Sequence, residues 1–419
     1  MRLFNTLNRK IEKFSPQEKT VTVYICGITP YDTTHLGHAF TYTNADILVR
    51  YLEFKGYPVR FVQNVTDIDD DILRKAKEAK EDWRALGNRW TRHFINDMLA
   101  LNIRPPDAYP RATDVIEEII EMVKSLLRAG IAYEAGGSVY FNQQSWPEFG
   151  KLSRLTRQEM LPIANERGNR PDDPNKKSPL DFVLWQAQAP GEPAWESPWG
   201  PGRPGWHIEC SAMSTSLLAK SIDIHMGGGD LLFPHHECGI AQVEPITRER
   251  PFVRYWVHIA MVHHEGEKMS KSLGNLVMVR DLLKEWSADA IRIYLGLHHY
   301  RQVWSHNEAE LKDAAQLEKK LLAAVNARSG QGNSLDLNAC QSAFLEAMDD
   351  DLNTHLAMRS LGELAERILI ASANRNDVDR AQSLLRSLGG IFGLRLGARS
   401  PEARVASGWE EHLRRFQQP

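Results

Sequence analysis

Residues 21–69 read VTVYICGITPYDTTHLGHAFTYTNADILVRYLEFKGYPVRFVQNVTDID, and this stretch decides the fold. Its first seven residues are β-branched and aromatic and end on a glycine, as a buried parallel strand does. Residues 40–56 then show helical apolar spacing and close on Gly56, and residues 57–69 return to strand composition. The order strand, helix, strand predicts the parallel α/β core of a nucleotide-binding domain.

The size and charge of the chain limit what it can be. A length of 419 residues predicts two or three domains. The net charge of -3 gives no global basic surface, so any contact with RNA has to be local. The N-terminus lacks a long apolar segment, and no run of eighteen apolar residues occurs, so we expect a cytoplasmic protein rather than a secreted or membrane-spanning one.

The pattern along the chain predicts three parts. Residues 1–304 are expected to form the catalytic nucleotide-binding domain, with an insertion at about 110–205 that is rich in proline and glycine. Residues 305–390 have helical periodicity throughout and predict a helical bundle. Residues 391–419 show weak periodicity and are expected to be a loosely ordered tail.

Two short motifs suit phosphate chemistry. HLGH, from His35 to His38, stands where the first strand meets the first helix, and backbone amides and the helix dipole favour an anion there. GEKMSKSLGN puts Lys268 and Lys271 in a short loop after a strand. Mobile lysines suit a departing pyrophosphate whose charge grows in the transition state. Each motif alone also fits a structural or solvated role, but the pair favours ATP chemistry.

Three residues from separate elements are candidate metal ligands. Cys26 ends the first strand, Cys210 lies in GWHIECSAM, and His235 opens HHECG. Three converging ligands that leave a fourth position open are typical of a catalytic zinc, whereas core packing is the alternative for any single buried cysteine. Cys238, one helical turn after His235, is either a fourth ligand or a thiol beside the site. Cys340 is expected to pack, and four cysteines are too few for a disulfide framework.

Taken together, these motifs resemble the class I aminoacyl-tRNA synthetases, whose two ATP signatures are HLGH and KMSKS. Within that class the chain is similar to the cysteine branch over nearly residues 1–390. The matching segments are NVTDIDD, PLDFVLW, GPGRPGWHIECSAMS, DLLFPHHE and MDDDLNT. The resemblance implies an α/β, split Rossmann-like nucleotide-binding domain with an insertion, followed by an all-α bundle. It also implies activation of L-cysteine by ATP as cysteinyl-AMP, with one Zn²⁺ completed by the substrate thiolate and Mg²⁺ accompanying ATP.

The resemblance further assigns roles to individual residues. His35 and His38 would assist the α-phosphate, and Lys268 and Lys271 would stabilise the departing pyrophosphate. Cys26, Cys210 and His235 would hold zinc. The expected contacts to the adenylate are Cys26, Gly27, Ile28, Thr29, Gly37, Thr41, Asn64, Val65, Thr66, Trp206, Gly228, Gly229, Asp230 and Val262. No general base for the transfer step is assigned, and Asp230 and His225 are nominal candidates only.

The acceptor of the activated cysteine is the open question, because the cysteine branch has two arms. The synthetase arm carries a zinc-ligating glutamate where this chain has Gly239, and usually reads CGPTVYD where this chain reads CGITPYD. Residues 166–177, ERGNRPDDPNKK, resemble the ERGGDP segment of the mycothiol-pathway cysteine ligase, although Asn169 and Arg170 depart from it. The tail is also too short for an anticodon-reading domain.

The sequence therefore predicts a monomeric, zinc-dependent ligase that transfers cysteine to the amine of glucosaminyl-inositol. The alternative is a cysteinyl-tRNA synthetase with the same first step and tRNA(Cys) as acceptor. A third hypothesis is a catalytically silent protein that binds RNA or senses cysteine, and the two intact ATP signatures argue against it.

Overall fold

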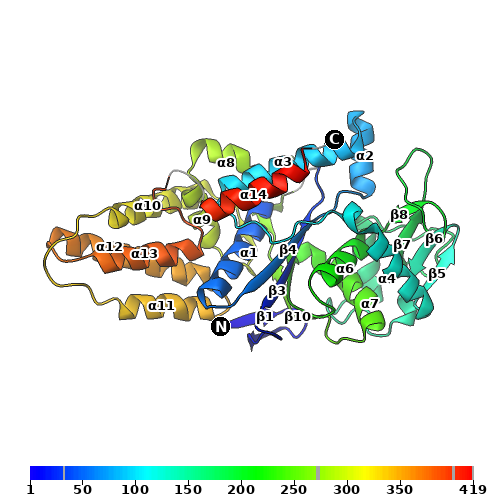
Figure 1. Cartoon of the computed structure of the whole chain (residues 1–419), viewed down its shortest axis with the longest axis horizontal. Coiled ribbons are helices and arrows are strands. Elements are labelled where there is room, and N and C mark those ends of the chain that lie inside the picture. The colour runs from blue at the N-terminus through cyan, green and yellow to red at the C-terminus, as the bar shows by residue number, and fades with distance from the viewer. Residues whose placement is uncertain (32–33, 270–273, 399–401, 418–419) are drawn as a thin grey trace.

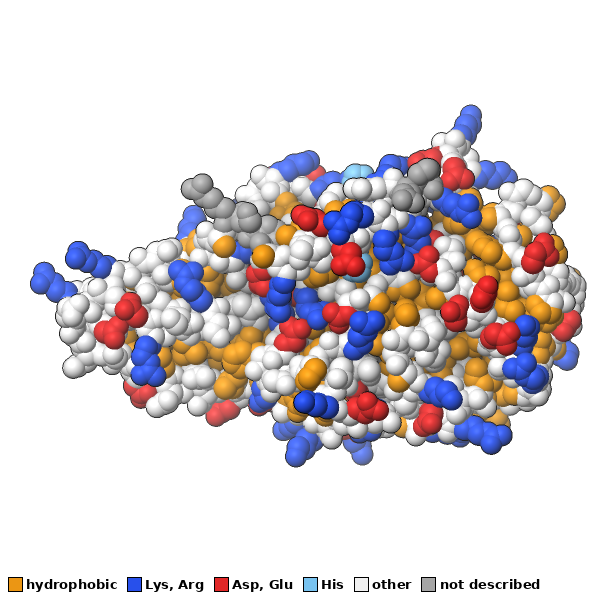
Figure 2. All heavy atoms as spheres, in the orientation of Figure 1, with side chains coloured by type: hydrophobic (Ala, Val, Ile, Leu, Met, Phe, Trp, Pro, Cys, Tyr) orange, Lys and Arg blue, Asp and Glu red, His pale blue; other side chains and the backbone are white. Residues whose placement is uncertain are grey.

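The structure is a computed structural model, and it describes residues 1–31, 34–269, 274–398 and 402–417. The molecule is elongated, with a helical bundle at one end, a small antiparallel sheet at the other, and a parallel sheet between them (Figure 1). Acidic and basic side chains are mixed over the face shown in Figure 2, in keeping with the small net charge. Among the described helices, none is long and apolar enough to cross a membrane.

The central sheet has four parallel strands in the order β10–β9–β3–β4. Strand β3 (Val21–Ile28), helix α1 (Leu36–Phe54) and strand β4 (Val59–Val65) form the predicted strand-helix-strand unit. The two remaining strands are β9 (Ile222–Gly228) and β10 (Val253–Ile259). The predicted α/β core is therefore confirmed.

Side chains of β3 alternate between two packed layers because successive residues of a strand point to opposite faces. Val23 and Ile25 belong to the core shared with α1 and the helical bundle. Tyr24 and Cys26 belong to the core on the other face, which is covered by α4 (Ile116–Arg128), α6 (Trp206–Leu217) and α7 (Glu237–Thr247). This alternation directs the Cys26 sulfur toward α6, which carries Cys210.

The predicted insertion lies between β4 and β9 in the chain. Its sheet is antiparallel, in the order β5–β6–β7–β8. Its remaining elements are β5 (Ala132–Ala135), β6 (Ser138–Phe141), α5 (Arg157–Glu166), β7 (Phe182–Ala187) and β8 (Gly202–Pro204). Strands β4 and β9 both pair with β3. The chain therefore leaves the parallel sheet after β4, forms the insertion, and returns to the same sheet at β9.

Shorter elements complete the catalytic part. An N-terminal hairpin, β1 (Arg2–Asn5) and β2 (Lys10–Lys13), packs beside β10. The others are α2 (Asp70–Ala79), α3 (Trp83–Ala100), β11 (Val262–His264), β12 (Glu267–Lys268), α8 (Val279–Glu285), α9 (Ala288–Gly296) and β13 (Trp304–Ser305). The bundle consists of α10 (Glu308–Val325), α11 (Asn338–Asp349), α12 (Thr354–Ala373) and α13 (Asp379–Ile391).

The expectation of a loosely ordered tail is wrong. Residues Ala403–Arg415 form helix α14, which lies along α3 (Figure 1). Trp409 is fully buried, and its indole N–H donates to the Ile103 carbonyl at 2.8 Å. A buried aromatic ring with a satisfied N–H is a strong anchor, and it fixes the helix to the catalytic part rather than to the bundle.

Candidate functional site

A cavity of about 580 Å³ lies between the central sheet and the insertion. Phe233 and Phe182 form part of its apolar wall, and Asp69, Asp70 and Asp71 form an acidic part. The predicted site residues on its wall are Gly27, Ile28, Thr29, His35, His38, Trp206 and Asp230. The HLGH histidines, which are predicted to contact ATP, and Trp206, which lies beside the predicted metal ligands, therefore line the same cavity.

Other predicted adenylate contacts do not line this cavity. Asn64 uses its side-chain oxygen to accept from the Gly27 N–H at 2.8 Å and its amide to donate to Thr66. Thr41 donates its hydroxyl to the Gly37 carbonyl at 3.0 Å, within α1. The predicted contacts outside the cavity wall are Cys26, Gly37, Thr41, Asn64, Val65, Thr66, Gly228, Gly229 and Val262. Asn64 supports the backbone at Gly27, near the end of β3. A Cβ on Gly27 would lie 1.5 Å from the Asn64 carbonyl oxygen.

His35 and His38 form a reciprocal cap at the start of α1. His35 Nδ1 accepts from the Gly37 N–H at 3.1 Å, and His38 Nδ1 accepts from the His35 N–H at 3.4 Å. The two rings stack with their centroids 3.9 Å apart. A ring nitrogen that accepts a backbone N–H carries no proton, so each neutral imidazole holds its proton on Nε2. The cap thus presets two N–H donors at a helix N-terminus, where an anion is favoured.

The KMSKS lysines are only partly placed. The Lys268 backbone forms β12 and pairs with His263 of β11. Lys271 lies outside the described residues. Their roles toward pyrophosphate stay predictions.

The three predicted metal ligands come together. Cys26, Cys210 and His235 are buried, and their ligand atoms lie within 4.8 Å of one another. The Cys26 and Cys210 sulfurs are 3.9 Å apart. Two Zn–S bonds of about 2.3 Å at a tetrahedral angle separate their sulfurs by about 3.8 Å, so this pair has the span that zinc requires. A site of two thiols and one imidazole fits a zinc ion.

The two thiols respond differently to their surroundings. The hydrogen bond with Cys26 holds the pKa of Cys210 well below its ordinary value. Burial raises the pKa of Cys26. His235 is oriented by two neighbours: its Nδ1 lies 3.1 Å from His207 Nδ1, and its ring stacks on Trp206 at 4.7 Å. Such partners orient a metal-ligating histidine.

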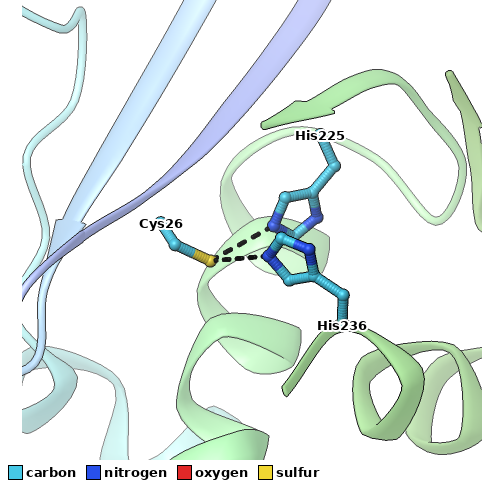
Figure 3. Close-up of side chains that lie close together, drawn as sticks. All are labelled: Cys26, His225 and His236. Carbon is cyan, nitrogen blue, oxygen red and sulfur yellow. Dashed lines mark hydrogen bonds between the residues drawn. The ribbon is translucent and has the colours of Figure 1, made fainter. Parts of the chain in front are cut away.

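Two further histidines surround Cys26, and the sequence analysis missed their connection to it. His225 Nε2 and His236 Nε2 lie 3.4 and 3.3 Å from the Cys26 sulfur (Figure 3). With Cys26 they form a second group of possible metal ligands. His225 comes from a buried strand and stacks on Trp256. It lies off the cavity wall, so it is no candidate for a general base toward an acceptor.

Acidic side chains lie near the start of α2 and on α6, with Asp67 and Asp69 half-buried. Burial raises the pKa of Asp69 to about 7 and that of Asp67 to about 6. Asp69 also caps α2 by accepting from the Ile72 N–H at 2.8 Å. Glu209, next to Cys210, is fully buried, and burial raises its pKa well above the ordinary value. Near neutral pH this region therefore carries less negative charge than its composition indicates.

The segment 166–177 forms a wall of the same cavity. Arg167 reaches across to Asp230, with Nη2 and Oδ2 at 3.1 Å. Lys176 donates to the Asn169 side-chain oxygen at 2.6 Å. The members of this segment that line the cavity are Glu166, Arg167, Gly168, Asn169, Arg170, Asp173 and Lys176. Residues 166–177 of the insertion therefore line the same cavity as the predicted ATP residues.

Comparisons with known proteins agree with this geometry. The family described as tRNA synthetases class I (C) catalytic domain matches residues 13–316, and the DALR domain matches residues 343–397. The chain belongs to this class I (C) synthetase family. Like its relatives it is an ATP-dependent, AMP-forming ligase, as the sequence predicted.

Curated relatives of this synthetase family resemble the chain over most of its length. A cysteine–tRNA ligase from Dehalococcoides mccartyi is 45% identical over 402 residues, covering 94% of this chain and 86% of that protein. One from Pyrococcus horikoshii is 44% identical, with the same two coverages. The methionyl-tRNA synthetase of Mycobacterium tuberculosis in complex with methionyl-adenylate has a TM-score of 0.64 at 17% identity, covering 95% of this chain and 93% of that one. That structural likeness confirms the synthetase fold.

Cys238 and Gly239 are the two positions at which the sequence raised the question of a fourth metal ligand. Cys238 is buried and lines the cavity, but among the described residues it belongs to neither group of possible ligands. A Cβ at Gly239 would meet only Ser211 Oγ, at 3.7 Å. The Cβ of a glutamate, the residue that the synthetase arm carries here, would therefore fit without a clash.

Gly239→Glu is expected to tighten zinc binding by about tenfold or more, because a carboxylate adds a ligand and even outer partners contribute that much. Competition with a chromophoric chelator measures the dissociation constant. Gly239→Gln, of equal size and without the charge, is the matched control. Equal zinc affinity in the two variants would contradict the proposed ligand position.

Proposed function

We propose that the protein is a cysteinyl-tRNA synthetase, which activates L-cysteine with ATP and transfers it to tRNA(Cys). The observation that carries the proposal is a buried Cys–Cys–His group beside the cavity that the HLGH histidines also line. The similarity to curated cysteine–tRNA ligases over 94% of the chain supports the same substrate. A zinc ion held by two thiolates and a histidine would take a substrate thiolate as a ligand in preference to a hydroxyl.

This proposal names tRNA as the acceptor, whereas the sequence alone favoured the amino sugar. The comparisons favour tRNA as acceptor, because identity with cysteine–tRNA ligases extends over both the catalytic part and the bundle. The features that suggested the amino sugar are local: Gly239, the CGITPYD wording and the segment 166–177. A few local replacements weigh less than agreement along most of the chain.

In this proposal the first step depends on positioning and charge stabilisation. The Nε2–H groups of His35 and His38 donate hydrogen bonds to the α-phosphate. Lys268 and Lys271 neutralise the departing pyrophosphate. Trp206 covers the cysteine side chain on the cavity side of His235. Cys26, Cys210 and His235 would hold zinc, which would supply a Lewis acid for the substrate thiolate. Mg²⁺ is expected with ATP.

Asp230 is proposed to accept hydrogen bonds from the sugar hydroxyls of ATP. It lies on the cavity wall and accepts from Arg167 at 3.1 Å, so the sugar hydroxyls of ATP have to share it with the insertion loop or displace Arg167. An ion pair between partly exposed groups is weak, which makes such displacement inexpensive. The loop 166–177 is thereby coupled to nucleotide binding.

A split acceptor assay tests the proposal. The purified protein receives ATP and labelled cysteine, with either tRNA(Cys) or glucosaminyl-inositol. We expect an alkali-labile ester on tRNA and no product with the amino sugar. A cysteinyl amide formed only with the amino sugar would overturn the proposed acceptor. Absence of cysteine-dependent pyrophosphate exchange with either acceptor would overturn the proposed activation step.

A further inference from the structure

A continuous row of short contacts runs from the N-terminal hairpin to Cys26. The Thr6 hydroxyl lies 2.8 Å from His258 Nδ1. His258 Nε2 lies 2.8 Å from His236 Nδ1, and His236 Nε2 lies 3.3 Å from the Cys26 sulfur. The last of these contacts is drawn in Figure 3. Thr6 is half-buried and remote in sequence from the other members, and both imidazoles use both ring nitrogens.

When Cys26 is a thiolate, the hydrogen bonds of the row can be donated in one direction only, from Thr6 toward Cys26. A thiolate only accepts, so the His236 proton has to sit on Nε2. His236 Nδ1 then accepts from the Nε2–H of His258, and His258 Nδ1 accepts from the Thr6 hydroxyl. Burial lowers the pKa of His258 to about 3, so its ring is neutral and has one proton to give. Thr6 is the only member of the row that can supply the terminal donor.

The surrounding backbone is shaped to hold this row. Gly227 pairs with His258 across the two neighbouring strands, and a Cβ on Gly227 would lie 2.8 Å from His236 Cε1. Glycine therefore leaves the space that the His236 ring occupies. Thr6 is fixed by its own N–H, which donates to the Trp256 carbonyl at 2.9 Å.

The other imidazole beside Cys26 differs. His225 Nδ1 is buried, and among the described residues it has no hydrogen-bond partner. The tautomer of His225 is thus determined at one nitrogen only, by Cys26. That of His236 is determined at both nitrogens, because its row extends to the hairpin. A partner that holds a histidine from behind orients it and fixes its proton.

We propose that Thr6 is a positioning residue of the metal site: through His258 and His236, its hydroxyl fixes the N–H that the Cys26 thiolate accepts. The inference rests on the proposed zinc ligands. It makes the N-terminal hairpin, which neither lines the cavity nor supplies a candidate metal ligand, a determinant of zinc affinity. It also assigns His236 to donation rather than to metal ligation, which separates the two groups that share Cys26.

Two variants of Thr6 test the proposal. Thr6→Val keeps the shape and removes the hydroxyl, and we expect the zinc dissociation constant to rise about tenfold, as on loss of an outer partner. Thr6→Ser keeps the donor and is expected to bind zinc as the natural protein does. Chelator competition measures the affinity, and thermal unfolding of both variants separates a metal effect from loss of the fold.

The histidine tautomers provide a readout that does not depend on activity. In zinc-loaded protein labelled with ¹⁵N-histidine, two-bond correlations should show His236 and His258 protonated on Nε2. Thr6→Val should change the His258 Nδ1 shift and leave that of His225. Protonation of His236 on Nδ1 would overturn the proposal, since its Nε2 would then be a ligand. Equal zinc affinity in Thr6→Val and the natural protein would also overturn it. Failure to charge tRNA would overturn the proposed function alone.

Discussion

Replacing Cys210 by alanine is expected to empty the zinc site and to lower cysteine-dependent pyrophosphate exchange by about a thousandfold. Cys210 contributes one of the two sulfurs that lie 3.9 Å apart, and its removal leaves Cys26 and His235 as the only members of that group. A Lewis acid contributes several kcal/mol to such sites, and about 4 kcal/mol corresponds to a thousandfold in rate. Metal analysis after gel filtration and exchange kinetics measure the two effects.

Other cysteine and histidine variants make this prediction specific. Cys26→Ala should abolish zinc binding whichever group holds the metal, because both groups contain Cys26. His236→Asn removes a ligand only from the second group and should leave much of the zinc in place. Cys340→Ala, in the bundle, is the neutral control, since its thiol contacts Arg367 far from the cavity. Full zinc content in Cys210→Ala with loss in His236→Asn would instead assign the metal to Cys26, His225 and His236.

The parts of the fold and of the candidate site that the sequence indicated depend on local pattern. The strand-helix-strand unit follows from apolar periodicity between residues 21 and 69, and HLGH is placed by the start of the helix that follows. Cys26 faces Cys210 and His235 because a buried strand directs alternate residues to one face.

The histidines around Cys26 could not be predicted in the same way. His225, His236 and His258 lie in three elements whose contacts depend on the register of the parallel sheet. A single histidine in a buried apolar strand indicates only a core residue. The pairing of His225 with Tyr24 of β3, which puts it beside Cys26, is a property of the folded sheet.

The tail was misread although a signal was present. Val405, Trp409 and Phe416 are spaced four and seven residues apart, which is the spacing of one helix face. All three are buried in α14 and its C-cap. The sequence favoured the amino sugar as acceptor for a different reason: Gly239, the CGITPYD wording and residues 166–177 are local features, and they report little about the large surface that a tRNA has to contact.

His38→Ala is expected to lower adenylate formation by about 10²- to 10³-fold, the effect of removing one aligned donor from a developing oxyanion. His38 lies on the cavity wall, and because its Nδ1 accepts from the His35 N–H, the neutral ring carries its proton on Nε2. The helix cap alone contributes about 1 kcal/mol to stability, too little to account for such a loss in rate. Pyrophosphate exchange measures the rate, and equilibrium dialysis measures cysteine binding, which should survive.

His38→Asn separates the cap from the catalysis. Asparagine can accept from the His35 N–H through its side-chain oxygen and still present an N–H donor, so it should recover part of the lost rate. A stability equal to that of the natural protein, together with an intermediate rate, would assign the deficit of the alanine variant to the missing donor. If both variants form adenylate at the natural rate, the HLGH histidines act only as a helix cap, and the α-phosphate has to be stabilised by the KMSKS lysines and the backbone amides of α1.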